Sequence, residues 1–317
     1  MVVLGHIYQN ATFHNFVYAF HMPLFFMAAG WLYKTKPVKD YTTHRFFTVM
    51  IPYFSFGLIT LLYWQLIERH FRASDMGFID SFIGLIRGEY DFLDFNVHLW
   101  FLPCFFLTVV IYNVLRNVVG RRGTYIIALG LSAVYVVGAY WAALPSLPWG
   151  LNRVCQYIGF YAIGNWMSER KLSSKIEAGS KPFWVVIATV LLAAVFVFSL
   201  FGFTNGIFWF IIGTIGTVAV GIYSILLSSA GAIIFNNLIS FLGRISLIVL
   251  CVHGPVYRVV CKFLSVVIGW KTDVVRSNFL FAVVIVVITL AICSIAYMVI
   301  DKVLPWMIGK SKRSEKS

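Results

Sequence analysis

The chain has 317 residues, of which 60% are hydrophobic, 18% aromatic and only 12% charged, and its mean hydropathy is +0.86. A soluble domain of this length does not need so much apolar surface, and repeated apolar runs of about 20 residues indicate a polytopic helical membrane protein. A transmembrane β-barrel would alternate apolar and polar positions over about ten-residue segments, which the runs 183–200 and 279–300 do not. We therefore predict an all-α fold, a bundle of transmembrane helices.

The formal net charge of +13 does not indicate a nucleic-acid partner, because of where the charges lie. Lys and Arg cluster in the short connections between apolar runs, as they do in the cytoplasmic loops of membrane proteins. The five cysteines are odd in number and lie within or beside apolar runs, so neither a disulfide framework nor a metal site is predicted. The N-terminus lacks a charged region followed by a small-residue cleavage site, so no removable signal peptide is expected.

The first apolar run, 1–8, is too short to cross a hydrocarbon core, which needs about 20 helical residues. We interpret it either as the end of a helix whose start precedes Met1 or as a segment that dips into the bilayer. A span at 16–33 follows, and 34–45 is predicted to be a basic loop broken by Pro37. With the truncated first segment, ten membrane segments are expected, the others lying at 46–67, 99–115, 125–143, 149–167, 183–200, 207–229, 245–264 and 279–300.

The connection 68–97 carries six carboxylates and is predicted to lie on the outer side. Within it, apolar side chains recur at helical spacing from Phe78 to Ile86, which predicts a short amphipathic helix on the membrane surface. Such a segment can act as a lid over a site or can be a solvated loop with one packed helix.

Threading the spans alternately places 17 of the 25 Lys and Arg residues on one side and 8 on the other. The positive-inside rule makes the first side cytoplasmic and puts both termini there. One transmembrane domain is expected over 1–309, followed by a basic cytoplasmic tail at 310–317.

Polar side chains at membrane depth are few, and ionisable ones are costly there, so they are candidates for function. His6 and His21 flank one tight polar turn, which predicts that two antiparallel helices hold them at similar depth. Gly5 permits close approach of another chain or a ligand beside His6. A neutral imidazole can accept a proton from a hydroxyl, as a general base must. No carboxylate or cysteine lies at ligand spacing from either histidine, so no metal site is predicted.

Several motifs together resemble the acyltransferase-3 family of integral membrane O-acyltransferases, and most closely its fucose 4-O-acetylase-like branch. They occur in the family's order and extend over nearly the whole chain. The motifs are Val3-Leu4-Gly5-His6, Phe20-His21-Met22-Pro23-Leu24-Phe25-Phe26, Ala29-Gly30-Trp31-Leu32, Arg45 leading to Ile51-Pro52-Tyr53, His98-Leu99-Trp100-Phe101-Leu102, Tyr157-Ile158-Gly159-Phe160-Tyr161-Ala162-Ile163-Gly164 and Ser246-Leu247-Ile248-Val249-Leu250-Cys251-Val252-His253-Gly254-Pro255.

The resemblance implies transfer of an acyl group, commonly acetyl, from cytoplasmic acyl-CoA to a hydroxyl of a cell-surface carbohydrate or lipid-linked glycan. It implies a bacterial inner membrane location, no bound cofactor, and acyl-CoA as co-substrate. The family's catalytic histidine maps onto His6, with His21 as its orienting or substrate-contacting neighbour. The family's basic residue about three helical turns earlier would precede Met1, so the chain is expected to lack the first part of that helix. The family's basic pair before the third span is reduced here to Arg45, with Thr48 at the second place.

Two groups of side chains are predicted to bind the substrates. Cations on the cytoplasmic side can hold CoA phosphates by charge-assisted hydrogen bonds, although they can equally be topology signals only. Polar and aromatic residues on the outer side can stabilise an oxyanion or stack on a sugar, although interfacial aromatic belts have the same composition. The first group is Arg45, Lys39, Arg121 and Arg122, and the second is His98, Trp100, Asn152, Arg153 and His253.

Two other functions remain open at this stage. A transporter or flippase of a glycan or small molecule would use His6, His21 and His253 to relay protons or bind substrate, and would show inverted repeats with broken helices. No matched pair of such segments is evident. A membrane glycosyltransferase would use Asp91 and Asp94, whose spacing is not that of a usual metal-nucleotide pair. The acceptor, the acyl group and the oligomeric state stay open.

Overall fold

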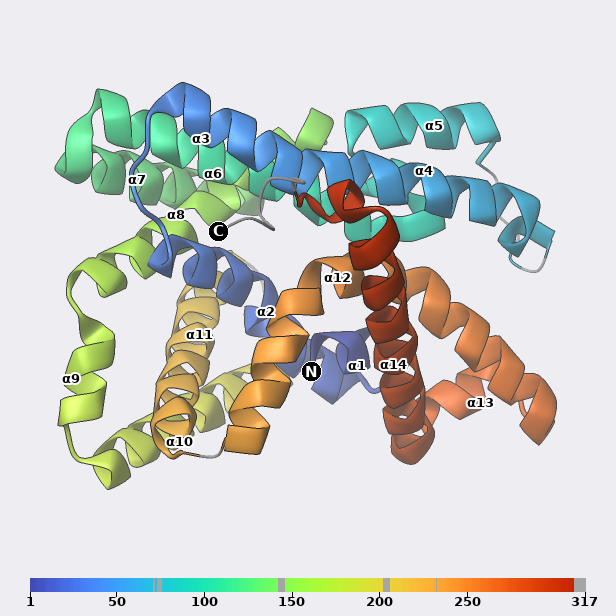
Figure 1. Cartoon of the computed structure of the whole chain (residues 1–317). Coiled ribbons are helices and arrows are strands. Elements are labelled where there is room, and N and C mark those ends of the chain that lie inside the picture. The colour runs from blue at the N-terminus through green and yellow to red at the C-terminus, as the bar shows by residue number, and fades with distance from the viewer. Residues whose placement is uncertain (71, 73–75, 142–145, 202–205, 232, 311–317) are drawn as a thin grey trace. The chain divides into compact units, whose positions relative to one another are not determined.

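A computed structural model describes residues 1–70, 72, 76–141, 146–201, 206–231 and 233–310 (Figure 1). All regular structure in these residues is helical, and they contain no strand. The prediction of an all-α fold is therefore confirmed. Of the predicted basic tail 310–317, only Lys310 belongs to the described residues.

Six described helical runs are long and apolar enough to cross a membrane, so the chain is an integral membrane protein. Three other helices, α2, α7 and α8, have 21, 22 and 19 residues, which is long enough to span by length. The count of ten segments stays a prediction. The six runs are Val38–His70, Asp94–Val118, Lys181–Leu200, Gly206–Ser229, Ile233–Ile268 and Phe279–Val303.

The observed helices follow the predicted apolar runs closely, with ends shifted by a few residues in most cases. Short 3₁₀ segments lie between them at Glu68–His70, Tyr90–Phe92, Asp94–Trp100, Pro148–Gly150 and Pro305–Ile308. The α-helices are α1 (Val2–Ile7), α2 (Ala11–Trp31), α3 (Val38–Arg45), α4 (Ile51–Leu66), α5 (Phe78–Arg87), α6 (Phe101–Val118), α7 (Gly120–Trp141), α8 (Leu151–Glu169), α9 (Leu172–Ala178), α10 (Lys181–Leu200), α11 (Gly206–Ser229), α12 (Ile233–Ile268), α13 (Thr272–Ser277) and α14 (Phe279–Val303).

The prediction of a loop over 34–45 is wrong for its second half, because Val38–Arg45 forms α3. Pro37 has a fixed φ and stands where a helix needs no N–H donor, and Asp40 in the first turn suits the helix dipole. The chain then continues through a π-turn at Phe46–Met50 into α4. Pro52 would crowd the carbonyl four residues earlier in a regular α-helix, and the wider π-turn lies at that point.

The chain forms two compact units that are interleaved in sequence. Unit 1 comprises Met1–Thr35, Ile111–Leu144 and Cys155–Leu242, and unit 2 comprises Lys36–Val110, Pro145–Val154 and Gly243–Ser317. The chain passes from one unit to the other within α6, α8 and α12.

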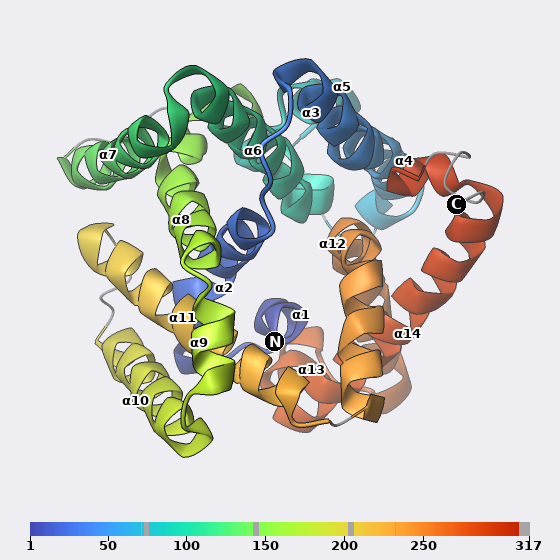
Figure 2. The same ribbon diagram turned by 60° about the vertical axis from the view of Figure 1, so that its left-hand side comes forward.

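In unit 1, helix α2 packs against α1, α10 and α11. Helices α10 and α11 lie side by side in both views (Figure 1, Figure 2). Gly30 of α2 and Gly164 of α8 each lie against a backbone carbonyl of the other helix, so a Cβ at either glycine would overlap that carbonyl. Small residues permit such close backbone packing between membrane helices. These contacts fix α2, and with it His21, against its neighbours.

Unit 2 contains α4 with α5 packed along it (Figure 1). The predicted amphipathic helix is confirmed as α5, whose buried residues are Ser81, Gly84 and Leu85. Tyr53 of α4 donates a hydrogen bond from its hydroxyl to the Leu85 carbonyl at 2.6 Å. The opposite face of α5 is exposed and apolar, as a helix at a membrane surface would be. Its position at that surface stays a prediction. The exposed side chains are Phe78, Ile79, Phe82, Ile83 and Ile86.

Candidate active site

In unit 1, α1 and the start of α2 bring His6 and His21 together. Asn10 caps α2 by accepting a hydrogen bond from the Phe13 backbone N–H at 2.9 Å, which ends the turn between the two helices. The two imidazole centroids are 6.2 Å apart and the rings are nearly perpendicular. His21 is buried, and its Nδ1 lies 3.2 Å from the Val17 carbonyl oxygen. Since Nδ1 must carry the proton to donate to that carbonyl, Nε2 of a neutral His21 is a proton acceptor.

Tyr18 connects these two histidines. Its hydroxyl forms a hydrogen bond with Nδ1 of His6, and its ring centroid lies 4.5 Å from that of His21. When His6 donates from Nδ1 to the Tyr18 oxygen, its Nε2 holds a lone pair that can accept a proton. Sequence reasoning missed Tyr18. The signal was its position three residues before His21, which puts both side chains on one face of α2.

In unit 2, the segment Asp94–Trp100 contacts α12 through a side-chain hydrogen bond. This bond takes the place of a backbone hydrogen bond that α12 lacks at its proline. Pro255 lies inside α12 and has no N–H, so the carbonyl of Cys251 loses its usual donor. The side chain of Asn96, which is fully buried, donates from Nδ2 to that carbonyl at 2.7 Å. The freed carbonyl is thereby satisfied, and the segment is fixed against α12.

Beside this contact, His98 and His253 meet with ring centroids 4.2 Å apart. Gly254 makes the contact possible, because a Cβ at that position would lie 2.8 Å from Nδ1 of His98. His253 is buried, and its Nδ1 lies 2.7 Å from the Val249 carbonyl oxygen, so that nitrogen donates. Nε2 of His253 is then the nitrogen that can accept a proton or a hydrogen bond.

A buried carboxylate pairs with an arginine that contacts the same segment. Glu68 is 6% exposed and pairs with Arg258 at 2.6 Å and with Arg72 at 3.1 Å. Arg258 also donates from Nη2 to the Phe95 carbonyl at 2.8 Å. Although Glu68 belongs to the predicted acidic connection, it is part of the packed unit and not of a solvated loop.

A second group in unit 2 contains Trp100 and Arg153. The guanidinium carbon of Arg153 lies 4.5 Å from the Trp100 ring centroid and 4.9 Å from that of Tyr90. Cations are attracted to aromatic faces at such distances. The neighbouring Asn152 has a buried Oδ1 with no hydrogen-bond partner among the described residues. The residues predicted to bind the acceptor thus form two groups, His98 with His253 and Trp100 with Arg153, and Tyr90 is an addition that the sequence did not reveal.

The cations predicted to bind acyl-CoA lie on two helices. Lys39 and Arg45 belong to α3 of unit 2, where Lys39 is exposed and the Arg45 guanidinium lies 5.0 Å from the Tyr41 ring centroid. Arg121 and Arg122 lie in the first turn of α7 of unit 1, and both are exposed. Arg122 forms no ion pair among the described residues.

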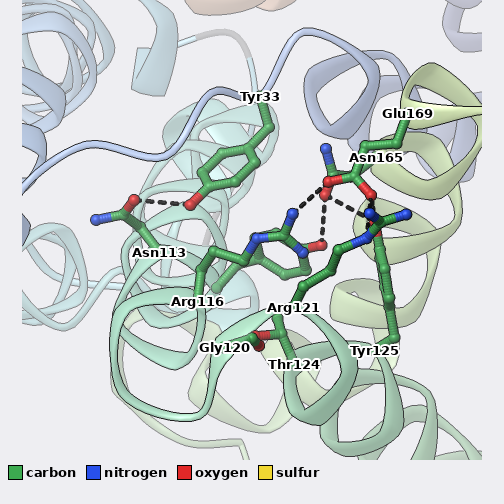
Figure 3. Close-up of polar contacts among 10 residues, drawn as sticks. Tyr33, Asn113, Arg116, Gly120, Arg121, Thr124, Tyr125, Asn165 and Glu169 are labelled. Carbon is green, nitrogen blue, oxygen red and sulfur yellow. Dashed lines mark hydrogen bonds and ion pairs between the residues drawn. The ribbon is translucent and has the colours of Figure 1, made fainter.

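Arg121 belongs to a network around Glu169 at the end of α8 (Figure 3). The Glu169 carboxylate lies 2.8 Å from Nε of Arg121, accepts a hydrogen bond from the Tyr125 hydroxyl at 2.8 Å, and pairs with Arg116. The Tyr125 hydroxyl also lies 3.1 Å from Oδ1 of Asn165. A phosphate that binds Arg121 must therefore compete with this carboxylate, whereas Arg122 has no such competitor.

The helical spans define an integral membrane protein, and each of its two units contains a pair of neighbouring histidines. Residues 1–298 match the family model described as an acyltransferase domain, acyltransferase-3, so the chain belongs to that family. It is therefore a membrane acyltransferase by family, which does not favour the transporter alternative. No curated protein matches the chain. No solved structure matches it either.

Proposed function

We propose that the protein moves an acyl group from cytoplasmic acyl-CoA to a hydroxyl of a cell-surface carbohydrate or lipid-linked glycan. The acyl group that we propose is acetyl. The observation that carries the proposal is the His6–Tyr18–His21 cluster in a chain whose family is acyltransferase-3. The proposed location is a bacterial inner membrane with both termini in the cytoplasm, as the charge distribution of the loops predicts.

In this proposal His6 is the general base. Its Nε2 removes the proton of the acceptor hydroxyl while the hydroxyl oxygen attacks the thioester carbonyl carbon. A carbon–oxygen bond forms, the carbon–sulfur bond breaks, and the CoA thiolate leaves and takes the proton from His6. Such proton transfer contributes about 10²- to 10⁴-fold in rate. Since a thioester is already activated, the remaining requirement is to hold the two substrates in position.

The other residues have positioning roles in the proposal. Tyr18 accepts the hydrogen bond from Nδ1 of His6 and so keeps Nε2 available, and His21 orients or contacts the acceptor. His98, Trp100, Asn152, Arg153 and His253 contact the acceptor or the developing oxyanion, and Arg45, Lys39, Arg121 and Arg122 contact the CoA phosphates.

The test is transfer of radiolabelled acetyl from acetyl-CoA into alkali-labile ester in the glycan fraction of membranes that contain the full-length protein. His6→Ala is expected to abolish transfer, and His70→Ala is the matched control because His70 is exposed on unit 2. The proposal fails if membranes with His6→Ala transfer acetyl at the wild-type rate while holding the same amount of folded protein.

A further inference from the structure

Arg153 differs from three other arginines of unit 2 in how its charge is compensated. Arg72, Arg87 and Arg258 each form an ion pair with a carboxylate. Arg153 forms no ion pair and no hydrogen bond among the described residues, and its contacts are with the faces of Trp100 and Tyr90. Its positive charge therefore has no anionic partner in the part of the chain that the structure describes.

The backbone that presents Arg153 has an unusual conformation. Trp149 has φ of 58° and Gly150 has φ of 62°, so two successive residues lie in the left-handed region, where non-glycine residues are uncommon. The Trp149 indole N–H donates to the Ile86 carbonyl at 2.8 Å, and a Cβ at Gly150 would lie 3.2 Å from Cβ of Cys104. These contacts hold the turn, and α8 starts directly after it at Leu151. The side chain of Arg153 is thus placed by packed structure and not by a free loop.

The chemistry of the guanidinium group determines which ligand fits. An arginine that is held by aromatic rings and not by a carboxylate keeps N–H groups that can donate two parallel hydrogen bonds to a carboxylate or a phosphate. Tyr90 is 42% exposed, so the edge of this group is open to a ligand. Aromatic faces next to a cation also suit the ring of a sugar that carries such an anion.

We propose that Arg153, Trp100 and Tyr90 form a site for an oxyanion on the acceptor, so that the acceptor is an acidic carbohydrate. This inference rests on the proposed function for the identity of the acceptor. Either a uronic-acid carboxylate or a sugar phosphate supplies the required chemistry, and a lipid phosphate is the competing source.

The experiment measures binding to purified full-length protein in detergent by saturation-transfer difference NMR, with acetyl-CoA left out. The probes are glucuronate, glucose 1-phosphate and neutral glucose, with dihexanoyl-phosphatidylglycerol as the lipid arm. At least one of the two charged sugars should bind about tenfold more tightly than glucose, as expected for hydrogen bonds to a charged group. Arg153→Gln should remove that preference, and Arg153→Lys should restore only part of it.

Arg69→Gln is the matched control, because Arg69 also lies over a tryptophan, Trp64, but is exposed and donates to Gln65. It should leave the preference unchanged. Equal binding of charged and neutral sugars by the wild type, a preference that survives in Arg153→Gln, or Arg153-dependent binding of the lipid alone would overturn the proposal. Because no acyl donor is present, failure here is separate from failure of acyl transfer.

Discussion

Replacing Glu169 by Gln should destabilise unit 1, because this carboxylate is the common partner of two guanidinium groups and a phenol (Figure 3). The two arginines differ in exposure. The side chain of Arg116 is 11% exposed, whereas that of Arg121 is 58% exposed. The isosteric change keeps an acceptor oxygen but removes the negative charge that compensates both of them.

The expected loss of unfolding free energy follows from the exposed fractions of these two arginine side chains. A solvent-exposed pair such as Arg121 with Glu169 contributes about 0–1 kcal/mol. Leaving a buried charge without its partner costs about 3–5 kcal/mol. Arg116 is close to this situation because most of its side chain is buried. We expect Glu169→Gln to lower the free energy of unfolding by about 3 kcal/mol, a value closer to that of a buried unpaired charge than to that of an exposed ion pair. Arg121→Gln should lower it by less than about 1 kcal/mol.

The assay is thermal unfolding in detergent followed by a thiol-reactive fluorophore, since Cys104, Cys251, Cys261 and Cys293 are buried and react only on unfolding. Arg116→Met combined with Glu169→Gln should recover part of the lost stability, because no buried charge is then left alone. If Glu169→Gln melts at the same temperature as Arg121→Gln, the carboxylate does not compensate a buried charge and the reasoning is wrong.

Three further substitutions test the two histidine groups. Tyr18→Phe should lower the rate of acyl transfer about tenfold with unchanged thermal unfolding, and should shift the pH profile of the rate, which a purely structural role would not do. Gly254→Ala should destabilise by about 1–3 kcal/mol through overlap with His98, whereas Gly243→Ala in the same helix, with open space around it, should be neutral or stabilising. Asn96→Leu should destabilise by about 1–3 kcal/mol, because the Cys251 carbonyl is left without a donor. Equal melting temperatures for Gly254→Ala and Gly243→Ala, or for Asn96→Leu and wild type, would contradict the described packing.

Much of the fold was predictable because long apolar runs in this chain are helices. Hydropathy alone missed α3, since Lys39, Asp40 and His44 are polar and the helix is signalled by Pro37 and not by apolar periodicity. Hydropathy also treated Glu68 as part of a solvated connection, although it is buried and pairs with Arg258, which is distant in sequence, as well as with the nearby Arg72.

The candidate site was predictable only where it is local. His6 and His21 flank one turn, so their proximity followed from the sequence, whereas the meeting of His98 with His253 depends on how α12 packs. Pro255 signalled that a carbonyl in α12 would need a donor, but nothing in the sequence pointed to Asn96 as that donor. Long-range contacts of this kind are set by tertiary packing and leave no periodic pattern.

The central claim is that His6 is the base in acyl transfer. The most direct measurement is the rate at which membranes containing wild-type protein, His6→Ala or His70→Ala incorporate radiolabelled acetyl from acetyl-CoA into alkali-labile glycan esters. The account predicts transfer by the wild type and by His70→Ala, and a loss of about 10²- to 10⁴-fold in His6→Ala. Transfer by His6→Ala at the wild-type rate would contradict it.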